Sequence, residues 1–531
     1  MSLPTQPKRD IRTGSSYLLV DFGTTSTKSA LVDLDSGLFS HLLRHPSIPP
    51  QPAPSGRCEI SLEAIALGFE QICTSYLELT ERDAFAGIVI CSEMHGFAVL
   101  DRAPPHRPLT PYISWLDQRS LEPVNGVDTF AMITDRLGSG RFKAVTGMRL
   151  RPGLPLLNLV HWARSAPDVP PVGLVVSLPG WLALNANAAA PGHIGAPAGT
   201  GSPAAECVPP VEHPTMLAGM AFYDVNRHEV SRELLDLVRD LTGFSALLGE
   251  CASGAAAVAG HWYSDDGAIP IYAGVGDHQC SLLGAGLTPG DCASVNLGTG
   301  SQVSVLIAPG SDRPLPGSDE VELRPYFDAD HLLRTITHIP AGRALTEYIG
   351  FLHRIADAAL TGVADADAAS SPDAEMRGPR PAVNFWQQLT DLAIDDLDSS
   401  TLQFDLSIFQ GSRNYSTGGS LSRIEEGSLT PRNYLASLLN SFVRQYSEAL
   451  QVIDPEHQLE RILLSGGIAR NLLNLTDLFT SLTGYSALPA TDLDESLLGL
   501  RSLALVADGR AGTWLEAQQL FGCLCEVAET S

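Results

Sequence analysis

Residues 17–33 read YLLVDFGTTSTKSALVD and place a turn of Gly, Thr and Ser between two apolar runs. Asp21 ends the first run, Gly23 sits at the break, where glycine adopts a positive φ at little cost, and Lys28 opens the second run. Backbone N–H groups and hydroxyls in such a turn donate hydrogen bonds to an anion, so we expect a phosphate-binding hairpin. Its phosphate contacts would be Gly23, Thr24, Thr25, Ser26 and Lys28.

A second stretch repeats this pattern. Residues 292–307, CASVNLGTGSQVSVLI, place Gly298, Thr299 and Gly300 between an apolar strand and an alternating one. Either hairpin alone is accounted for by an ordinary Gly-containing turn, but the pair favours a duplicated fold with one nucleotide between its halves. Asp21 is then suited to hold Mg²⁺ through water, because Mg²⁺ keeps much of its hydration shell and prefers a carboxylate plus substrate phosphates.

Paired glycines occur in a third stretch, RILLSGGIARNLLNLTDLF at 461–479. Gly466 and Gly467 end a predicted strand just before a helix, so they would let the backbone approach a flat ligand, and the helix N-terminus favours negative charge. Alone, the stretch also fits a plain strand-to-helix turn. The sequence contains no G-x-x-x-x-G-K-[ST] loop, and GAGLTPG at 284–290 has the wrong glycine spacing for a dinucleotide-binding turn.

The strongest candidate for the chemistry itself is Asp277 in AGVGDHQCSLLGAGL, residues 273–287. An Asp at a strand end, flanked by Gly276, Gly284 and Gly286 that leave room for a substrate, can accept a proton from a hydroxyl as its oxygen attacks a γ-phosphate. The alternative is that Asp277 caps the helix that follows.

Two further segments, CSEMHGFAVLD at 91–101 and YISWLDQRS at 112–120, could line a sugar pocket. A lone His or Trp more often belongs to a core, but Met-His-Gly at a strand end is poor core material. The candidate sugar contacts are Glu93, Met94, His95, Trp115, Asp117 and Arg119.

Short apolar runs alternate with helical periodicity along the chain, which favours an α/β fold. The predicted strands are 86–92, 173–178, 269–275, 293–298 and 461–467, and the clearest helices are 231–243, 344–360 and 431–453. Two stretches rich in Ala, Gly, Pro and Ser, at 185–214 and 361–381, are expected to be surface insertions or mobile loops.

Composition limits the partners. The 531 residues contain 34 Lys and Arg against 60 Asp and Glu, a formal charge of −26 that repels nucleic acid and anionic membranes. Neither a signal-like start nor an apolar span is found, so we expect a cytoplasmic protein. The nine cysteines are odd in number and mostly scattered, which is typical of reduced thiols, and we interpret the close pair at 523 and 525 as structural.

These pieces, in this order, resemble the FGGY carbohydrate kinases of the actin and Hsp70 ATPase superfamily. The similar segments are DFGTTSTK, SEMHG, SWLDQRS, GVGDHQ, NLGTGS and LLSGGIARN. The resemblance implies two duplicated ribonuclease-H-like domains with an interdomain cleft, a sugar-binding domain at 14–287 and a nucleotide-binding domain at 288–531. It also implies ATP and Mg²⁺ as cofactors, and closure of the halves about a hinge near Leu287–Pro289.

Carried over by position, the resemblance makes Asp277 the general base, a sugar contact and, with Asp21, a metal contact. Met94 and His95 become sugar contacts, and the expected nucleotide contacts are Gly298, Thr299, Gly300, Gly466, Gly467 and Asn471. Gln279 in GDHQCS, together with LRPYFDADHLL at 323–333, looks most like sedoheptulokinase, with xylulokinase next.

Two positions depart from the family pattern. Glu93 stands where Gln is usual, and Ser412 in GSRNYS stands where the family has Glu. A carboxylate at position 93 would change which sugar hydroxyls are held, or pair with Arg119. The competing class is a non-catalytic sugar sensor on the same fold. The expected partners are thus a small sugar and ATP, without nucleic acid or membrane, and a homodimer is kept as one option for the oligomeric state.

Overall fold

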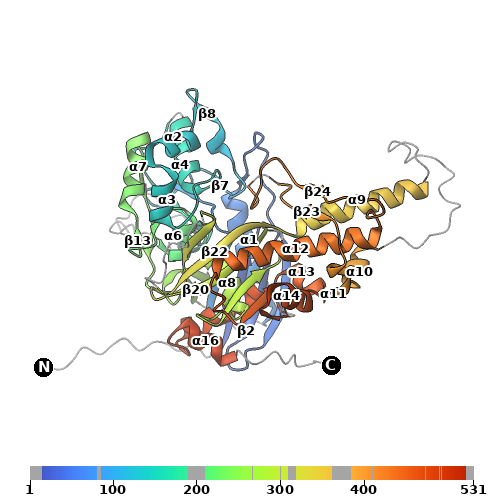
Figure 1. Cartoon of the computed structure of the whole chain (residues 1–531). Coiled ribbons are helices and arrows are strands. Elements are labelled where there is room, and N and C mark those ends of the chain that lie inside the picture. The colour runs from blue at the N-terminus through green and yellow to red at the C-terminus, as the bar shows by residue number, and fades with distance from the viewer. Residues whose placement is uncertain are drawn as a thin grey trace, which may run out of the picture. The chain divides into compact units, whose positions relative to one another are not determined.

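The chain was analysed as a computed structural model, whose elements are labelled in Figure 1. It describes residues 15–80, 85–166, 168–188, 210–265, 267–298, 300–308, 319–361, 384–409, 411–472, 474–489, 491 and 493–521. Thr299, most of the segments at 185–214 and 361–381, and the cysteines at 207, 523 and 525 lie outside these residues.

Two compact units make up the chain. Unit 1 contains Met1–Gly286, Leu323–Leu333 and Leu493–Ser531, and unit 2 contains Leu287–Glu322 and Arg334–Asp492. The units therefore differ from a simple division at 287–288, because two segments from the second half of the chain belong to unit 1.

The central sheet of unit 1 has the strand order β16-β17-β5-β1-β2-β3, and β18 also pairs with β5. Its strands are β1 (Ser16–Phe22), β2 (Ser26–Asp33), β3 (Phe39–Pro46), β5 (Gly87–Ser92), β16 (Val258–Ser264), β17 (Gly267–Tyr272) and β18 (Val275–Gly276). β1 is antiparallel to β2, whereas both β1 and β18 run parallel to β5. The carboxyl ends of β1, β5 and β18 consequently meet at one edge of the sheet.

Helices and short strands complete unit 1. The helices are α1 (Leu62–Leu79), α2 (Thr129–Leu137), α3 (Ser139–Thr146), α4 (Pro155–Ser165), α5 (Leu178–Ala188), α6 (Pro214–Gly219), α7 (Arg232–Thr242), α8 (Asp277–Gly284), α15 (Glu495–Asp508) and α16 (Trp514–Phe521), with a 3₁₀ turn η1 (Arg119–Leu121). The short strands are β4 (Glu59–Ile60), β6 (Ala98–Asp101), β7 (Tyr112–Ile113), β8 (Pro123–Val124), β9 (Val127–Asp128), β10 (Val172–Val176), β11 (Val211–Glu212), β12 (Tyr223–Asp224), β13 (Glu229–Val230), β14 (Ser245–Leu247) and β15 (Glu250–Cys251).

The central sheet of unit 2 has the strand order β22-β20-β19-β25-β26, and β21, the edge strand of the same sheet, is divided between the two units. Its strands are β19 (Cys292–Asn296), β20 (Gly300–Ile307), β21 (Val321–Pro325), β22 (Leu332–Pro340), β25 (Arg461–Ser465) and β26 (Ser486–Leu488), and a separate ribbon pairs β23 (Gln403–Asp405) with β24 (Ser420–Ser422). Its helices are α9 (Gly342–Thr361), α10 (Phe385–Thr390), α11 (Ile394–Asp398), α12 (Pro431–Ile453), α13 (Gly467–Asn471) and α14 (Leu475–Thr483).

The two sheets share one plan. In unit 1, β3, β2, β1, β5 and β17 lie side by side, so the strand order is third, second, first, fourth, fifth. In unit 2, β22, β20, β19, β25 and β26 repeat that order. Each sheet also begins with an antiparallel hairpin whose first strand runs parallel to the fourth. The predicted α/β class and the duplication of the fold are confirmed.

Local sequence explains the helices that were predicted most clearly. α7 begins after Ser231 and ends at Gly243, which adopts a left-handed φ of 75° that glycine tolerates. α12 begins with Pro431 after Thr430, whose hydroxyl accepts from the Asn433 amide. Each unit buries its own core: two clusters lie in unit 1, and one cluster around α12 lies in unit 2. Within the described residues, no helix is both long and apolar enough to span a membrane.

Helices α8 and α15 cross with their backbones in contact. A Cβ on Gly284 would lie 1.8 Å from the Glu495 carbonyl oxygen, and one on Gly499 would lie 2.0 Å from the Cys280 carbonyl oxygen. Only glycine fits at both points, so the crossing anchors α15 in unit 1. The expectation that Gly284 leaves room for substrate is therefore wrong, because the backbone of α15 fills that space.

Candidate functional site

Three carboxylates lie at the edge of unit 1 where β1, β5 and β18 end. Asp21 is the sixth residue of β1, Glu93 directly follows β5, and Asp277 directly follows β18 as the first residue of α8. The strand registers align Asp21 with Cys91 and Gly276 with Ser92. Parallel strands thus gather three acidic groups that are far apart in the sequence.

Asp277 has the environment of a general base. Burial, together with the charges of Asp21 and Glu93, raises its pKa from 3.8 to about 7, against smaller lowerings by the His278 amide and Lys28. That amide donates to Asp277 Oδ1 at 2.8 Å, which leaves Oδ2 for a ligand. The helix cap itself is Gly276, so the alternative in which Asp277 caps α8 is wrong: it lies one residue too far along the chain.

Asp21 is held by a charged network that includes two residues from α15. Lys28 Nζ lies 3.1 Å from Asp21 Oδ2 and 2.8 Å from Asp494 Oδ2. The Ser496 hydroxyl donates to Asp21 Oδ2 at 2.5 Å. Burial lowers the pKa of Lys28, but the two carboxylates raise it to about 12, so Lys28 remains a cation. Asp21 Oδ1 accepts only a weak S–H contact from Cys91, at 3.4 Å.

Sequence reasoning missed Asp494 and Ser496. Asp494 caps α15 and accepts from the Ser496 amide, and an Asp before an apolar periodic run is a usual sign of a helix start. Its position beside Lys28 follows from the crossing of α8 and α15, which local sequence does not reveal.

The turn between β1 and β2 has its predicted hydroxyls near the surface. Thr24 and Thr25 are exposed, and Ser26 and Lys28 are partly exposed. Gly23 does not adopt a positive φ, contrary to prediction. Glycine is favoured there by space instead, because a Cβ would lie 3.1 Å from the Ser26 carbonyl oxygen.

Glu93 bonds to that turn rather than to Arg119. The Thr24 hydroxyl donates to Glu93 Oε2 at 2.8 Å, and the Trp115 Nε1–H donates to Thr24 Oγ1 at 3.1 Å. Burial raises the pKa of Glu93, although hydrogen bonds from Thr24 and its neighbours oppose the rise. Trp115 is 39% exposed, so its ring stands at the rim of this cluster.

Asp117 and Arg119 are buried against one another. Arg119 donates from Nε and Nη2 to the two oxygens of Asp117, both at 2.8 Å, and from Nη2 to Glu59 Oε1 at 2.5 Å. The suggested pairing of Glu93 with Arg119 is thus wrong, because Asp117 and Glu59 occupy the guanidinium. Asp117 and Arg119 therefore stabilise the loop that carries Trp115.

Met94 lies close to the start of α8, and His95 lies beside Gly219 at the end of α6. A Cβ on Gly276 would lie 2.7 Å from Met94 Sδ, so that glycine lets Met94 approach the start of α8. His95 has a left-handed φ of 65°, its Nδ1 lies 2.7 Å from the Gly219 carbonyl oxygen, and its Nε2 lies 3.3 Å from Arg324 Nη1. This pairing fits a neutral ring protonated on Nδ1.

The segment Leu323–Leu333 contributes to this part of unit 1 from the second half of the chain. Gln279 is fully buried, and its Nε2–H donates to the Pro325 carbonyl at 3.3 Å. Arg324, in the same segment, reaches His95. The stretch LRPYFDADHLL therefore lies beside the predicted sugar contacts, and Gln279 contacts that stretch.

In unit 2, glycines dominate the corresponding edge. β19 runs parallel to β25 with Asn296 opposite Ser465, so the loops after both strands are neighbours. Gly466 has a φ of 88°, and a Cβ there would lie 2.8 Å from the Leu297 carbonyl. The Gly342 amide, at the start of α9, donates to the Gly298 oxygen at 3.2 Å. Gly467 faces open space, Gly300 begins β20, and Asn471 is exposed at the end of α13.

The described residues alone supply only some of the contacts that the expected nucleotide and metal would need. Among the described residues, no group of three or more His, Cys, Asp or Glu side chains is arranged to hold a metal ion. Asp21 Oδ1 and Asp277 Oδ2 are the carboxylate oxygens that the network leaves open. Such a pair suits Mg²⁺, which takes its other ligands from water and phosphate.

Comparison with known proteins matches the N-terminal part of the chain to a family of kinases. Residues 16–169 match the family model for the FGGY family of carbohydrate kinases, N-terminal domain. None of the curated proteins matches the chain in sequence.

Solved structures resemble almost the whole chain. Gluconate kinase from Lactobacillus acidophilus has a TM-score of 0.70 at 16% identity, covering 95% of this chain and 91% of its own. Ligand-bound xylulose kinase from Lactobacillus acidophilus has a TM-score of 0.69 at 17% identity, covering 95% and 92%. Glycerol kinase from Plasmodium falciparum with ADP has a TM-score of 0.70 at 14% identity, covering 96% and 92%. The fold is that of these kinases, and together with the family match it supports an enzyme that is a carbohydrate kinase.

Proposed function

We propose that this chain is an ATP-dependent kinase that phosphorylates a terminal hydroxyl of a ketose, with sedoheptulose and D-xylulose as the two candidate substrates. The observation that carries the proposal is the placement of Asp277 beside Asp21 and Lys28, with its pKa raised to about 7. A general base works best when its pKa lies near the working pH.

Each group at the edge of unit 1 has a role in this proposal. Asp277 Oδ2 accepts the proton of the sugar hydroxyl as that oxygen attacks the γ-phosphate. Lys28 supplies positive charge beside the phosphates, and Asp494 and Ser496 keep Lys28 and Asp21 in position. Asp21 and, through water, Asp277 would hold Mg²⁺, which would supply positive charge to neutralise the transferring phosphoryl group.

The sugar would contact unit 1 and the nucleotide unit 2. Met94, which lies near the start of α8, is one of the side chains that we assign to the sugar, and His95 and Trp115 are the others. Backbone at Gly298, Gly466 and Gly467 is assigned to ATP, because glycines there allow close approach of phosphate and base. Thr299 and Asn471 complete the proposed nucleotide contacts.

Support for a ketose comes from two sources. Gln279 and the stretch at 323–333 resemble sedoheptulokinase, whereas similar folds include the xylulose kinases of Lactobacillus acidophilus and Brucella ovis. Glu93 adds a buried carboxylate beside Thr24, which would accept a hydrogen bond from a sugar hydroxyl once the Thr24 hydroxyl turns away.

A substrate panel tests the proposal. Sedoheptulose, D-xylulose, gluconate and glycerol are each incubated with Mg-ATP, and ADP release is followed by a coupled assay. We expect sedoheptulose or D-xylulose to give the highest kcat/KM. Turnover of glycerol or gluconate alone would overturn the ketose assignment, and sugar binding without ADP release from any of them would favour the non-catalytic sensor.

A further inference from the structure

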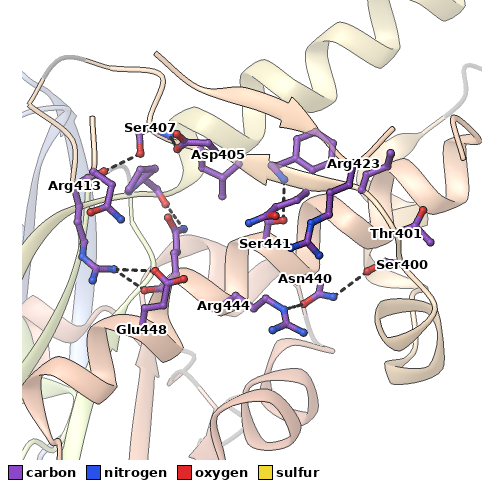
Figure 2. A pocket seen from close by; sticks show the side chains of 17 residues that line it. Ser400, Thr401, Asp405, Ser407, Arg413, Arg423, Asn440, Ser441, Arg444 and Glu448 are labelled. Carbon is purple, nitrogen blue, oxygen red and sulfur yellow. Dashed lines mark hydrogen bonds and ion pairs between the residues drawn. The ribbon is translucent and has the colours of Figure 1, made fainter. Parts of the chain in front are cut away.

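A cavity lies within unit 2, and none of the residues assigned above to sugar or nucleotide lines it. Its volume is about 470 Å³, and its walls are β23 with the residues around it, the C-terminal half of α12, and the loop after β24. Figure 2 shows its lining side chains. A cavity of this size accommodates a small metabolite.

The charge of the lining is unusual for this chain. Three arginines, Arg413, Arg423 and Arg444, line the cavity with two carboxylates, Asp405 and Glu448, and Arg413 also pairs with Glu320. The chain as a whole has a formal charge of −26. Guanidinium groups that lack a carboxylate partner in so acidic a protein attract an anion.

Two of the three arginines are available to a ligand. Arg413 is committed to the protein, because it donates to both oxygens of Glu320 and to the Gln445 carbonyl. Arg444 donates only to Asn440 Oδ1, at 2.7 Å, and has no carboxylate partner among the described residues. Arg423 is exposed, and among the described residues it has no hydrogen-bonding or charged partner.

The two available guanidinium groups come from different walls. Arg444 belongs to α12, whereas Arg423 follows β24 directly and adopts a left-handed φ of 58°. In Figure 2, the Arg423 side chain extends across the cavity past Ser441, toward the wall that carries Arg444 and Asn440. A left-handed φ costs energy in a residue with a Cβ, and such strain is often found at functional sites.

The remaining lining combines apolar residues, among them Leu402, Phe404 and Leu406, with polar groups that are held in place. The Ser441 hydroxyl accepts from the Phe404 amide, and Asn440 Nδ2 donates to Ser400 Oγ at 2.9 Å and to the Leu397 carbonyl. Ser407 Oγ donates to the Arg413 carbonyl at 2.8 Å. Hydroxyls and amides fixed in this way are suited to the hydroxyl groups of a sugar.

We propose that this cavity binds a phosphorylated sugar. Arg423 and Arg444 take the phosphate, because the planar guanidinium donates two parallel hydrogen bonds to phosphate oxygens. The Ser441 hydroxyl proton is not committed, and the oxygens of Ser400 and Asn440 can each accept a further hydrogen bond, so these groups take the sugar. The proposal does not depend on the proposed kinase reaction, since none of these residues belongs to it.

Isothermal titration calorimetry of the full chain tests the site. Glucose 6-phosphate, glucose and inorganic phosphate are titrated separately into the wild type, the double variant Arg423→Ala/Arg444→Ala, and the control Arg354→Ala. Arg354 is 67% exposed on α9 and does not line the cavity. We expect glucose 6-phosphate to bind more tightly than either other probe, with Kd at least about tenfold weaker in the double variant and unchanged in the control.

Three results would overturn the proposal. These are no binding of glucose 6-phosphate to the wild type, equal binding to the double variant, or binding of inorganic phosphate as tight as that of glucose 6-phosphate. The single variant Arg423→Gln guards against misfolding, because Arg423 has no bond to lose, and it should also weaken binding. The kinase assay is run on the same variants, and unchanged turnover there separates this site from the catalytic one.

Discussion

The two hairpins that open the two sheets differ in chemistry while sharing a fold. In β1 and β2, Asp21 lies opposite Lys28, whereas in β19 and β20 Asn296 lies opposite Gln302. The strand that runs parallel to the first one carries Cys91 beside Asp21 and Ser465 beside Asn296. One copy thus holds an ion pair where the other holds two amides.

Under the proposed function, this difference assigns different roles to the two copies. Around the charged hairpin of unit 1 stand further ionisable groups, Glu93, Asp277 and Asp494, which suit proton transfer and metal binding. Around the neutral hairpin of unit 2 stand Gly298, Gly342 and Gly466, which suit close backbone contact with a ligand. Duplication supplied one framework, and substitutions at matching positions specialised each copy.

The largest effect should come from Asp277→Asn. The substitution keeps the shape of the side chain but removes its ability to accept a proton. We expect turnover to fall by about 10²- to 10⁴-fold, roughly 2.7 to 5.5 kcal/mol of barrier, while ATP affinity changes little because unit 2 supplies it. Steady-state kinetics and nucleotide titration measure the two effects separately. Near-normal turnover would remove Asp277 from the mechanism and make Glu93 the next candidate.

The same substitution should also alter how stability depends on pH. The folded-state pKa of Asp277 is raised, from 3.8 to about 7, so the folded protein binds this proton more tightly than the unfolded chain. Its contribution to stability is full below pH 3.8 and is lost as pH rises through 7. Asn does not ionise, so the Asp277→Asn variant does not lose stability in this way. Urea unfolding at pH 8 should therefore find the variant more stable than the wild type by on the order of 2–4 kcal/mol. The difference should vanish near pH 4, and a constant difference would contradict the raised pKa.

In unit 2, Gly466→Ala and Gly467→Ala form a matched pair. Gly466 has a φ of 88° and a crowded Cβ position, whereas Gly467 has neither restriction. Gly466→Ala should destabilise the protein by about 1–3 kcal/mol and weaken ATP binding, because the loop must shift. Gly467→Ala should leave the melting temperature unchanged and raise only the KM for ATP. If neither variant changes nucleotide affinity, the assignment of this loop to ATP is wrong.

In unit 1, the ion-pair network predicts coupling between Lys28 and Asp494. Lys28→Ala leaves Asp21 and Asp494 without their cation, so the free energy of unfolding should fall by about 1–3 kcal/mol. Adding Asp494→Ala should recover part of that loss, because one uncompensated charge disappears. Urea denaturation of the two single variants and the double variant measures the coupling energy. Additive losses would show that α15 does not stabilise Lys28.

The smallest effect concerns the pH profile of the wild type. Asp277 acts as a base only when ionised, so kcat should rise with pH through about 7 and then level off. At pH 6 the rate should be about tenfold below the plateau, since roughly one molecule in ten is ionised one unit below the pKa. A rate that stays level from pH 5 to pH 8 would contradict the assignment.

Much of the fold could be predicted from the sequence because its signals are local. Apolar runs that stop at Gly or at polar residues indicated β5, β19 and β25, and the helical period between Ser231 and Gly243 indicated α7. The repeated hairpin indicated the duplication, because both copies kept their turn residues.

Long-range packing could not be predicted in the same way. The segment Leu323–Leu333 and α15 belong to unit 1, and only the crossing at Gly284 and Gly499 explains how Asp494 reaches Lys28. Arg119 likewise pairs with Glu59, which lies 60 residues earlier in the sequence, and not with Glu93. The sequence does not reveal which residue pairs with a given charged side chain, so ion pairs between distant segments can be identified only from the structure.

The most direct test of the central claim is mass spectrometry of the sugar after incubation with Mg-ATP and the protein. Wild type and Asp277→Asn are compared at equal, saturating nucleotide. The account predicts a singly phosphorylated ketose from the wild type and about 10²- to 10⁴-fold slower formation by the variant. Release of ADP without phosphorylated sugar, or equal product from both proteins, would contradict it.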